Sequence, residues 1–189
     1  GCYGINSSFE HFYEQIKGFY RIFTASIQNC SPTTQTFSLM ITVSPVATRK
    51  ELKEFTKFKI KLYAGNPYAV PPLYADEREA LLKGHNPALK VYDHQVFLAK
   101  RDGKTVGRIV AIINHISNRK TGKACVRFGF IDFVEDFEVA KALIETVEQW
   151  GRERGMEAIH GPLGFTDFDP EGMLIYGFDE VSTIACLYN

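Results

Sequence analysis

The sequence lacks an excess of charge of either sign, and it lacks any long apolar run. Lysine plus arginine and aspartate plus glutamate number 22 each, so the formal net charge of the 189 residues is zero. A neutral chain carries no overall electrostatic footprint for nucleic acid. No apolar run approaches the ~18 residues that a membrane-spanning helix needs. We therefore expect neither a nucleic acid nor a membrane among its partners.

Closely spaced cysteine pairs are also missing. The four cysteines are Cys2, Cys30, Cys125 and Cys186, and no two of them form a CxxC pair. Such spacing is typical of small thiols in a reducing compartment and not of a disulfide framework or a zinc site. The pattern predicts a cytoplasmic protein in which Cys125 packs at the start of a strand.

The clearest structural signal is a β-hairpin. Asp102-Gly103 separates the apolar runs Gln95–Arg101 and Thr105–Ile113. An Asp-Gly pair favours a type I′ turn, because that turn needs positive φ at both central residues. The pattern predicts two antiparallel neighbouring strands. The run Val126–Val134, dense in aromatic and β-branched residues, predicts a third strand.

Two helices and a further strand complete the expected elements. Thr48 and Glu51 form a capping-box pattern, which predicts the start of a helix. A second helix is expected from about Asp136 to Arg154, and a strand is expected over Ala158–Leu163. The apolar face of that second helix is formed by Ala140, Leu143, Ile144, Val147 and Trp150. The polar segment 114–122 predicts a loop between two central strands.

The first 39 residues differ from the rest of the chain. Segment 29–38 is rich in Ser, Thr and Pro, which is typical of a linker. Met40 resembles a natural protein start and opens an alternating strand pattern. We therefore predict an N-terminal extension with a linker over residues 1–39 and a main domain over residues 40–189. The sequence leaves open whether the extension is native.

The order strand, tight turn, strand, strand, helix, strand resembles the GNAT superfamily of acyl-CoA N-acyltransferases. The likeness is to the N-terminal half of longer, uncharacterised bacterial GNAT-like proteins and covers residues 41 to 189. It is carried by Asn66-Pro67-Tyr68 with Pro71-Pro72, Gly107-Arg108-Ile109, Phe128-Gly129-Phe130 and the Glu153–Met156 helix end.

This resemblance implies an α/β (α+β) fold with a mixed, mostly antiparallel sheet flanked by helices. GNAT folds continue past their fifth strand with a further helix and two strands, whereas this sequence stops at Asn189. We therefore expect a fold that is incomplete at its C-terminus. A missing C-terminal half or a second copy in a homodimer would complete it.

The resemblance also implies an acyl-CoA cosubstrate, whose pyrophosphate GNAT enzymes bind on backbone amides of a Gly-rich loop entering the helix. The matching residues here are Phe133, Val134, Glu135, Asp136 and Phe137. The stretch contains no glycine and no basic residue, and its acids occupy the place that suits a phosphate at a helix N-terminus. We expect this chain alone to bind acetyl-CoA weakly or not at all.

Asp132 is the candidate catalytic residue. If its strand alternates regularly, Asp132 shares a face with Phe128, Phe130 and Val134. A carboxylate on such a face can have a raised pKa and act as general base for an amine. The alternative is a carboxylate that pairs with a lysine or arginine, or that lies at the edge of the sheet. No histidine pair has metal-ligand spacing, so no metal site is expected.

Two functions therefore stay open. The first is an N-acyltransferase that moves an acyl group from acyl-CoA to a small-molecule amine. The second is a degenerate, non-catalytic GNAT-like module that supports a partner domain or a dimer. The acidic stretch after Asp132 favours the second, and the resemblance favours the first. The acyl acceptor and the oligomeric state cannot be derived from the residues.

Overall fold

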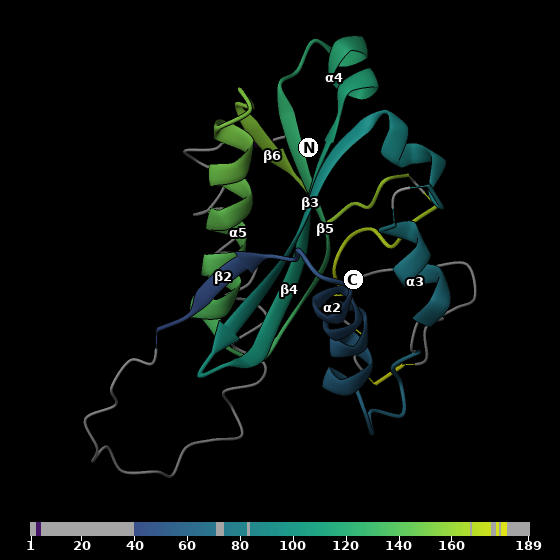
Figure 1. Ribbon diagram of the computed structural model, residues 1–189, viewed down its shortest axis with the longest axis vertical. Helices are drawn as coiled ribbons and strands as arrows, with labels where there is room; N and C mark the ends of the chain where they lie inside the picture. Colours follow the sequence, from purple (N-terminus) through teal and green to yellow (C-terminus); the bar gives the residue numbers. More distant parts are fainter. Residues whose placement is uncertain are drawn as a thin grey trace.

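In the computed structural model, a mixed six-stranded sheet forms the centre of the molecule, with helices on both of its faces (Figure 1). The structure describes residues 3–4, 40–70, 74–82, 84–166, 168–174, 177 and 179–180. The strand order is β1-β6-β5-β4-β3-β2. Only β5 and β6 are parallel neighbours, and the other pairs are antiparallel. The strands are β1 (Tyr3–Gly4), β2 (Thr42–Pro45), β3 (Tyr92–Arg101), β4 (Lys104–Asn114), β5 (Cys125–Phe133) and β6 (Ala158–His160).

Helices cover the two faces unequally. The helices α2 (Arg49–Leu62) and α3 (Tyr74–Ala80) lie over one face, and α5 (Phe137–Arg152) lies over the other (Figure 1). The short helix α4 (His115–Thr121) joins β4 to β5, and the 3₁₀ turn η2 (Pro87–Lys90) precedes β3. The predicted mixed, mostly antiparallel sheet flanked by helices is confirmed.

The predicted hairpin is confirmed. Asp102 and Gly103 have φ angles of 52° and 73°, as a type I′ turn requires, and Arg101 pairs with Lys104 across it. The two strands remain paired along their length up to Tyr92 and Asn114. This hairpin places β4 at the centre of the sheet, where both of its faces are covered.

Local chemistry sets the start of α2 as predicted. The Thr48 hydroxyl accepts a hydrogen bond from the Glu51 amide at 3.2 Å, and the Glu51 carboxylate accepts one from the Thr48 amide at 2.9 Å. This capping box satisfies two amides that the helix itself leaves unpaired. Leu52 and Phe55 on the inner side of α2 then pack on the sheet.

The apolar face predicted for α5 is buried throughout, Trp150 included. Cys125 is buried as well, as its predicted packing role requires. The helix lies very close to β4 at Gly107, where a Cβ atom would be 2.9 Å from side-chain atoms of Val139 and Leu143. Glycine at this position is therefore what lets the first turns of α5 approach the sheet.

Two local predictions were wrong. Segment 114–122 contains α4 and not only a loop, because Asn114 accepts a hydrogen bond from the Ser117 amide and Gly122 ends the helix with φ 66°. The last predicted strand stops at His160. Beyond it the backbone crosses β5, where the Leu163 amide donates to the Phe128 carbonyl at 2.8 Å.

The predicted boundary between residues 39 and 40 stays a prediction. Within the range 1–39, Tyr3 and Gly4 form β1 and pair with β6, Tyr3 opposite Ile159. The remainder of that range lies outside the described residues, and so do residues 181–189 at the expected point of incompleteness. Over the part of the chain that the structure describes, no helix combines the length and the apolar character needed to cross a bilayer.

Candidate functional site

A buried cluster of charged side chains lies between the sheet and the helices α2 and α3. Arg108 of β4 is its centre and is 1% exposed. Its Nε and Nη2 atoms both lie 2.7 Å from Oδ2 of Asp132 on β5, directly opposite in the β4–β5 register. Arg108 also donates to the Phe55 carbonyl at 3.0 Å, and its guanidinium lies over the Phe55 ring. Asp132 is therefore an ion-paired carboxylate.

Glu77 of α3 is the second acid of this cluster. Its Oε1 atom lies 2.6 Å from Nη1 of Arg108, and the residue is 8% exposed. Burial raises the pKa of Glu77, and the charge of Arg108 opposes that rise. A carboxyl with a raised pKa is suited to proton transfer near neutral pH.

Each acid keeps one oxygen without a hydrogen-bond donor. Among the described residues, Oε2 of Glu77 is buried and has no such partner, and Oδ1 of Asp132 is buried with the Tyr63 hydroxyl close by but no donor in direct hydrogen-bond contact. Nζ of Lys59 lies 4.0 Å from Oδ1. Buried polar atoms without a partner are rare in folded proteins, and a catalytic role is one of the reasons for them. These two oxygens are acceptors that an amine could use.

Tyr63 connects this cluster to the surface. It caps the C-terminus of α2 and keeps 39% of its surface exposed. Burial of its hydroxyl and the nearby charge of Asp132 raise the pKa of Tyr63, so the phenol stays protonated. Lys59, one turn earlier on α2, is only partly buried. The two side chains form the side of the cluster that solvent reaches.

The face on which Asp132 lies differs in part from the prediction. Phe130 has φ 52°, and the β4–β5 register shifts beside it, so the alternation of β5 changes there. Phe128 and Val134 pack in the core under α5, whereas Phe130 packs in the core under α2. Asp132 therefore shares its face with Phe130 alone among these three residues.

The predicted coenzyme residues lie at the N-terminus of α5. Phe133 ends β5, and the Val134 amide donates to the Val106 carbonyl at 2.9 Å. Asp136 caps α5 as predicted, accepting from the Glu138 amide at 2.9 Å. Glu135 is exposed, and Phe137 is half-buried on the first turn. The Asp136 carboxylate therefore already accepts a backbone amide at the N-terminus of α5.

A basic residue does reach this stretch, which the sequence pattern did not reveal. Nη2 of Arg101, at the end of β3, lies 2.6 Å from Oδ2 of Asp136. The β3–β4 hairpin brings the two together from positions 35 residues apart. A phosphate would need a position beside both the N-terminus of α5 and an arginine. The Asp136 carboxylate already occupies that position.

A shallow depression of about 440 Å³ lies at the opposite end of β5, around α4. It lies at the other end of β5 from Asp132, and its lining contains no acid. The rim is formed by His115, Asn118, Arg119, Gly122, Lys123, Ala124 and Met156. Among the residues that the structure describes, no group of three or more His, Cys, Asp or Glu side chains could hold a metal ion.

Curated relatives of this chain are bacterial and much longer. No family model matches the sequence. Protein YghO of Escherichia coli (strain K12) is 36% identical over 131 residues, which are 69% of this chain and 33% of that protein. A protein named bacterial ceramide synthase, from Caulobacter vibrioides, is 35% identical over 140 residues, which are 74% of this chain and 36% of that protein. The chain spans about a third of the length of these relatives.

Solved structures similar to this chain include a GNAT protein and proteins named as acetyltransferases. A tandem GNAT protein from the clavulanic acid biosynthesis pathway is 15% identical, with a TM-score of 0.49 over 64% of this chain and 35% of that chain. A GNAT acetyltransferase from Staphylococcus aureus Mu50 is 16% identical, with a TM-score of 0.46 over 64% and 71%. An aminoglycoside acetyltransferase from a soil metagenome is 16% identical, with a TM-score of 0.45 over 64% and 75%.

Sequence identities this low and TM-scores below 0.5 say nothing about the substrate or the catalytic activity of this chain. The sheet itself has the antiparallel β2–β5 set and the parallel β5–α5–β6 unit in the order that the sequence resemblance implies. The fold is GNAT-like. Within this GNAT-like fold, Asp132 lies on the central strand that leads into α5.

Sequence reasoning missed Arg108 and Glu77. Arg108 interrupts the otherwise apolar run of β4, and a charged residue inside such a run needs a buried partner. This charged residue within an apolar run could have been used to predict an acid on the neighbouring strand, which is Asp132. Glu77 carried no comparable signal, because acids in the first turn of a helix are ordinary.

Proposed function

We propose that this chain is the GNAT-like part of an N-acyltransferase that joins an acyl group from acyl-CoA to a long-chain amine. The observation that carries the proposal is the 35% identity, along 74% of the chain, to a protein named bacterial ceramide synthase. A ceramide is an amide of a fatty acid with the amine of a long-chain amino alcohol. Making that bond is an N-acyl transfer, which is the reaction that the GNAT resemblance implies.

The buried cluster supports this proposal by offering acids to the amine. In the reaction, the amine nitrogen attacks the thioester carbonyl, a C–N bond forms, and the C–S bond breaks. One proton leaves the amine, and the departing thiolate takes up a proton. We assign the amine contact to Oδ1 of Asp132 and the proton acceptor to Oε2 of Glu77, whose pKa is raised by burial.

Arg108 and Tyr63 have supporting roles in this scheme. Arg108 holds one oxygen of each acid, so that the other oxygen of each stays directed away from the guanidinium. Tyr63 marks the side from which an amine enters, next to Asp132. We place the protein in the reducing cytoplasm, in keeping with the buried thiol of Cys125.

The residues Phe133 to Phe137 do not fit the phosphates of acyl-CoA. Asp136 already caps α5 and pairs with Arg101, and Glu135 adds a further negative charge. We therefore assign no coenzyme contact to this stretch. The same observation favours the second candidate, a non-catalytic GNAT-like module that supports a partner domain or a dimer.

An assay of amide formation separates the two candidates. The purified chain is incubated with palmitoyl-CoA and sphinganine in detergent micelles, and the amide is measured by mass spectrometry. We expect the rate of amide formation to fall about 10²- to 10⁴-fold in Glu77→Gln and in Asp132→Asn, the range expected for losing a proton-transfer group.

Two variants serve as matched controls. Glu79→Gln removes an exposed acid from the same helix as Glu77, and Glu157→Gln removes one before β6. Both change the net charge as the test variants do, and both should keep wild-type activity. A folded chain that forms no amide at any acyl-CoA concentration would overturn the proposal and leave the non-catalytic module.

A further inference from the structure

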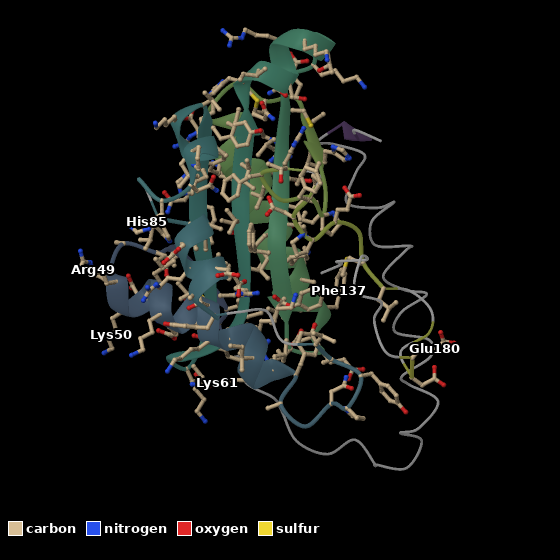
Figure 2. All side chains as sticks on the ribbon, turned by 90° about the vertical axis from the view of Figure 1, so that its right-hand side faces the viewer. Arg49, Lys50, Lys61, His85, Phe137 and Glu180 are labelled. Carbon is tan, nitrogen blue, oxygen red and sulfur yellow. The ribbon has the colours of Figure 1, made fainter. Side chains whose placement is uncertain are left out.

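One face of α2 carries a continuous row of basic side chains. Arg49, Lys50, Lys53, Lys57 and Lys61 are all exposed. At about 100° per residue they fall within an arc of about 120° around the helix. In Figure 2, the labelled Arg49, Lys50 and Lys61 project from α2 away from the sheet. The chain is neutral overall, so this row is a local concentration of positive charge.

No acid neutralises this row among the described residues. The helix contains two acids, and both are engaged elsewhere. Glu51 accepts hydrogen bonds from the Ala47 and Thr48 amides. Glu54 accepts from the Thr105 hydroxyl and pairs with Lys100 at 3.3 Å. Among the described residues, the five basic side chains of this row make no ion pair; Lys59, the sixth basic residue of α2, lies outside the row and faces Asp132.

The spacing of the basic side chains within this row destabilises α2 itself. Lys53, Lys57 and Lys61 follow one another at intervals of four residues, where side chains of like charge repel. The opposite side of α2, with Leu52 and Phe55, is already packed on the sheet. Only Lys61, in the last turn, is favoured by the helix dipole, and an anionic surface is the partner that would relieve the repulsion within the row.

Exposed apolar side chains follow at the C-terminal end of the same helix. Tyr68 is 38% exposed and Val70 is 66% exposed, in the loop that leads toward α3. Tyrosine is enriched where protein meets the headgroups of a bilayer. An aliphatic side chain such as Val70 gains from contact with lipid and has nothing to offer a phosphodiester backbone. Together with the basic row, these residues favour a lipid surface over a nucleic acid.

We propose that the basic face of α2 docks the protein on an anionic membrane surface. The row supplies electrostatic attraction to anionic headgroups, and the loop with Tyr68 and Val70 contacts the interface beside it. Because the apolar side of α2 is buried in the protein, attraction through the row dominates and is sensitive to salt. This peripheral contact differs from a membrane span and does not depend on the acyltransferase proposal. It differs from the expectation, drawn from the lack of a long apolar run, that no membrane is among the partners.

Co-sedimentation with vesicles tests the proposal on the whole chain. Vesicles of phosphatidylcholine alone are compared with vesicles that contain about one third phosphatidylglycerol. We expect sedimentation only with the anionic vesicles, and a loss when salt is raised from about 0.05 M to about 0.3 M. Lys53→Glu/Lys57→Glu/Lys61→Glu should weaken binding at least about ten-fold.

The matched control reverses three exposed basic residues at α4, in Arg119→Glu/Lys120→Glu/Lys123→Glu. It makes the same change in net charge and should keep binding. Tyr68→Ser/Val70→Ser should weaken binding and leave its salt dependence unchanged. Circular dichroism melting shows that each variant is folded.

Three results would overturn the proposal. The first is equal sedimentation with neutral and anionic vesicles, or none with either. The second is an equal loss of binding in the α2 variant and in the α4 control. The third is binding of a labelled single-stranded RNA, abolished by the α2 variant, with no binding to vesicles.

Discussion

Arg108 is the residue on which the buried cluster depends. It is the one cation within hydrogen-bond distance of both Asp132 and Glu77 among the described residues. A buried ion pair adds little net stability, because desolvation of the charges offsets their attraction. Removing only one partner is costly, since it leaves the opposite charge buried and unpaired.

The first prediction therefore concerns Arg108→Met. We expect this variant to lose about 3–5 kcal/mol of unfolding free energy, because two carboxylates lose their buried partner. Urea unfolding followed by circular dichroism measures the change. Arg119→Met, an exposed arginine on α4, is the control and should change stability by less than about 0.5 kcal/mol. An unchanged urea midpoint in Arg108→Met would show that Asp132 and Glu77 do not depend on Arg108 as their buried partner.

The second prediction concerns the pH dependence of Glu77. Burial raises its pKa in the folded state above the ordinary value of 4.5. Below pH 4.5 the carboxyl is protonated in both the folded and unfolded states, and its stabilising contribution is complete. As the pH rises through the raised pKa, the unfolded state releases the proton more readily, and that contribution is lost.

Glu77→Gln does not titrate, so it isolates this effect. The unfolding free energy of the wild type minus that of Glu77→Gln should fall as the pH rises from 4 toward 8. The same difference for Glu79→Gln, an exposed acid on α3, should stay flat. A difference that grows with pH would mean that attraction to Arg108 outweighs burial.

At the scale of single residues, the sequence predicted where a functional side chain such as Asp132 lies better than it predicted which side chains pair with it. It placed Asp132 inside a strand and named an arginine or lysine as its alternative partner, and the structure supplies Arg108. It could not place Glu77 beside them, because the contact between Glu77 on α3 and Arg108 on β4 joins residues 31 positions apart. Contacts between residues so far apart in sequence depend on the tertiary fold and leave no local pattern.

At the scale of elements, termini and turns were predictable where their chemistry is local. The Asp102-Gly103 turn and the capping box of Thr48 and Glu51 are determined by the conformations that those residues favour. The helix α4 was missed because its polar composition lacks the apolar periodicity of a helix. Its ends nevertheless carry typical cap residues, Asn114 and Gly122. The irregularity at Phe130 follows Gly129, and a glycine inside a strand pattern is a sign of a bulge that the predicted regular alternation did not take into account.

The third prediction concerns the acidic N-terminus of α5. Replacing Glu135 and Glu138 by glutamine and Asp136 by asparagine removes three negative charges and frees Arg101 from its ion pair. Asparagine still caps the helix, so α5 should persist. We expect anion binding to improve by about 1 kcal/mol at low salt. Calorimetric titration with acetyl-CoA measures it, against a wild type that binds weakly or not at all.

The control for that variant lies further along α5 and just beyond it. Glu145→Gln/Glu153→Gln/Glu157→Gln removes three exposed acids and should leave acetyl-CoA binding unchanged. Micromolar binding of acetyl-CoA by the unmodified chain would contradict the prediction. It would mean that the phosphates are held away from Phe133–Phe137.

At the scale of the whole molecule, the sheet order follows from a few elements. The hairpin sets β3 beside β4, and α5 makes the crossover that lets β6 lie parallel to β5. These steps were predictable from turn chemistry and from helical periodicity. The pairing of β1 with the outer edge of β6 was not, because Tyr3 and Gly4 form too short a segment to carry a pattern.

The fourth prediction tests the division of the chain at residue 40. Deleting residues 1–39 removes β1 and leaves the strands β2 to β6 with both of their described cores. We expect a protein that melts cooperatively and loses little stability, since β1 pairs through only two residues. Calorimetric melting of the two proteins makes the comparison. Loss of cooperative folding on deletion would show that this range is part of the domain.

The central claim is that this GNAT-like fold makes an amide from acyl-CoA and a long-chain amine. The most direct measurement uses palmitoyl-CoA labelled with ¹³C in its acyl group, sphinganine and the purified chain, with the product identified by mass spectrometry. We predict labelled N-acyl product and an equal amount of free CoA, both abolished in Asp132→Asn/Glu77→Gln. Free CoA without labelled amide, or labelled amide that persists in the double variant, would contradict the claim.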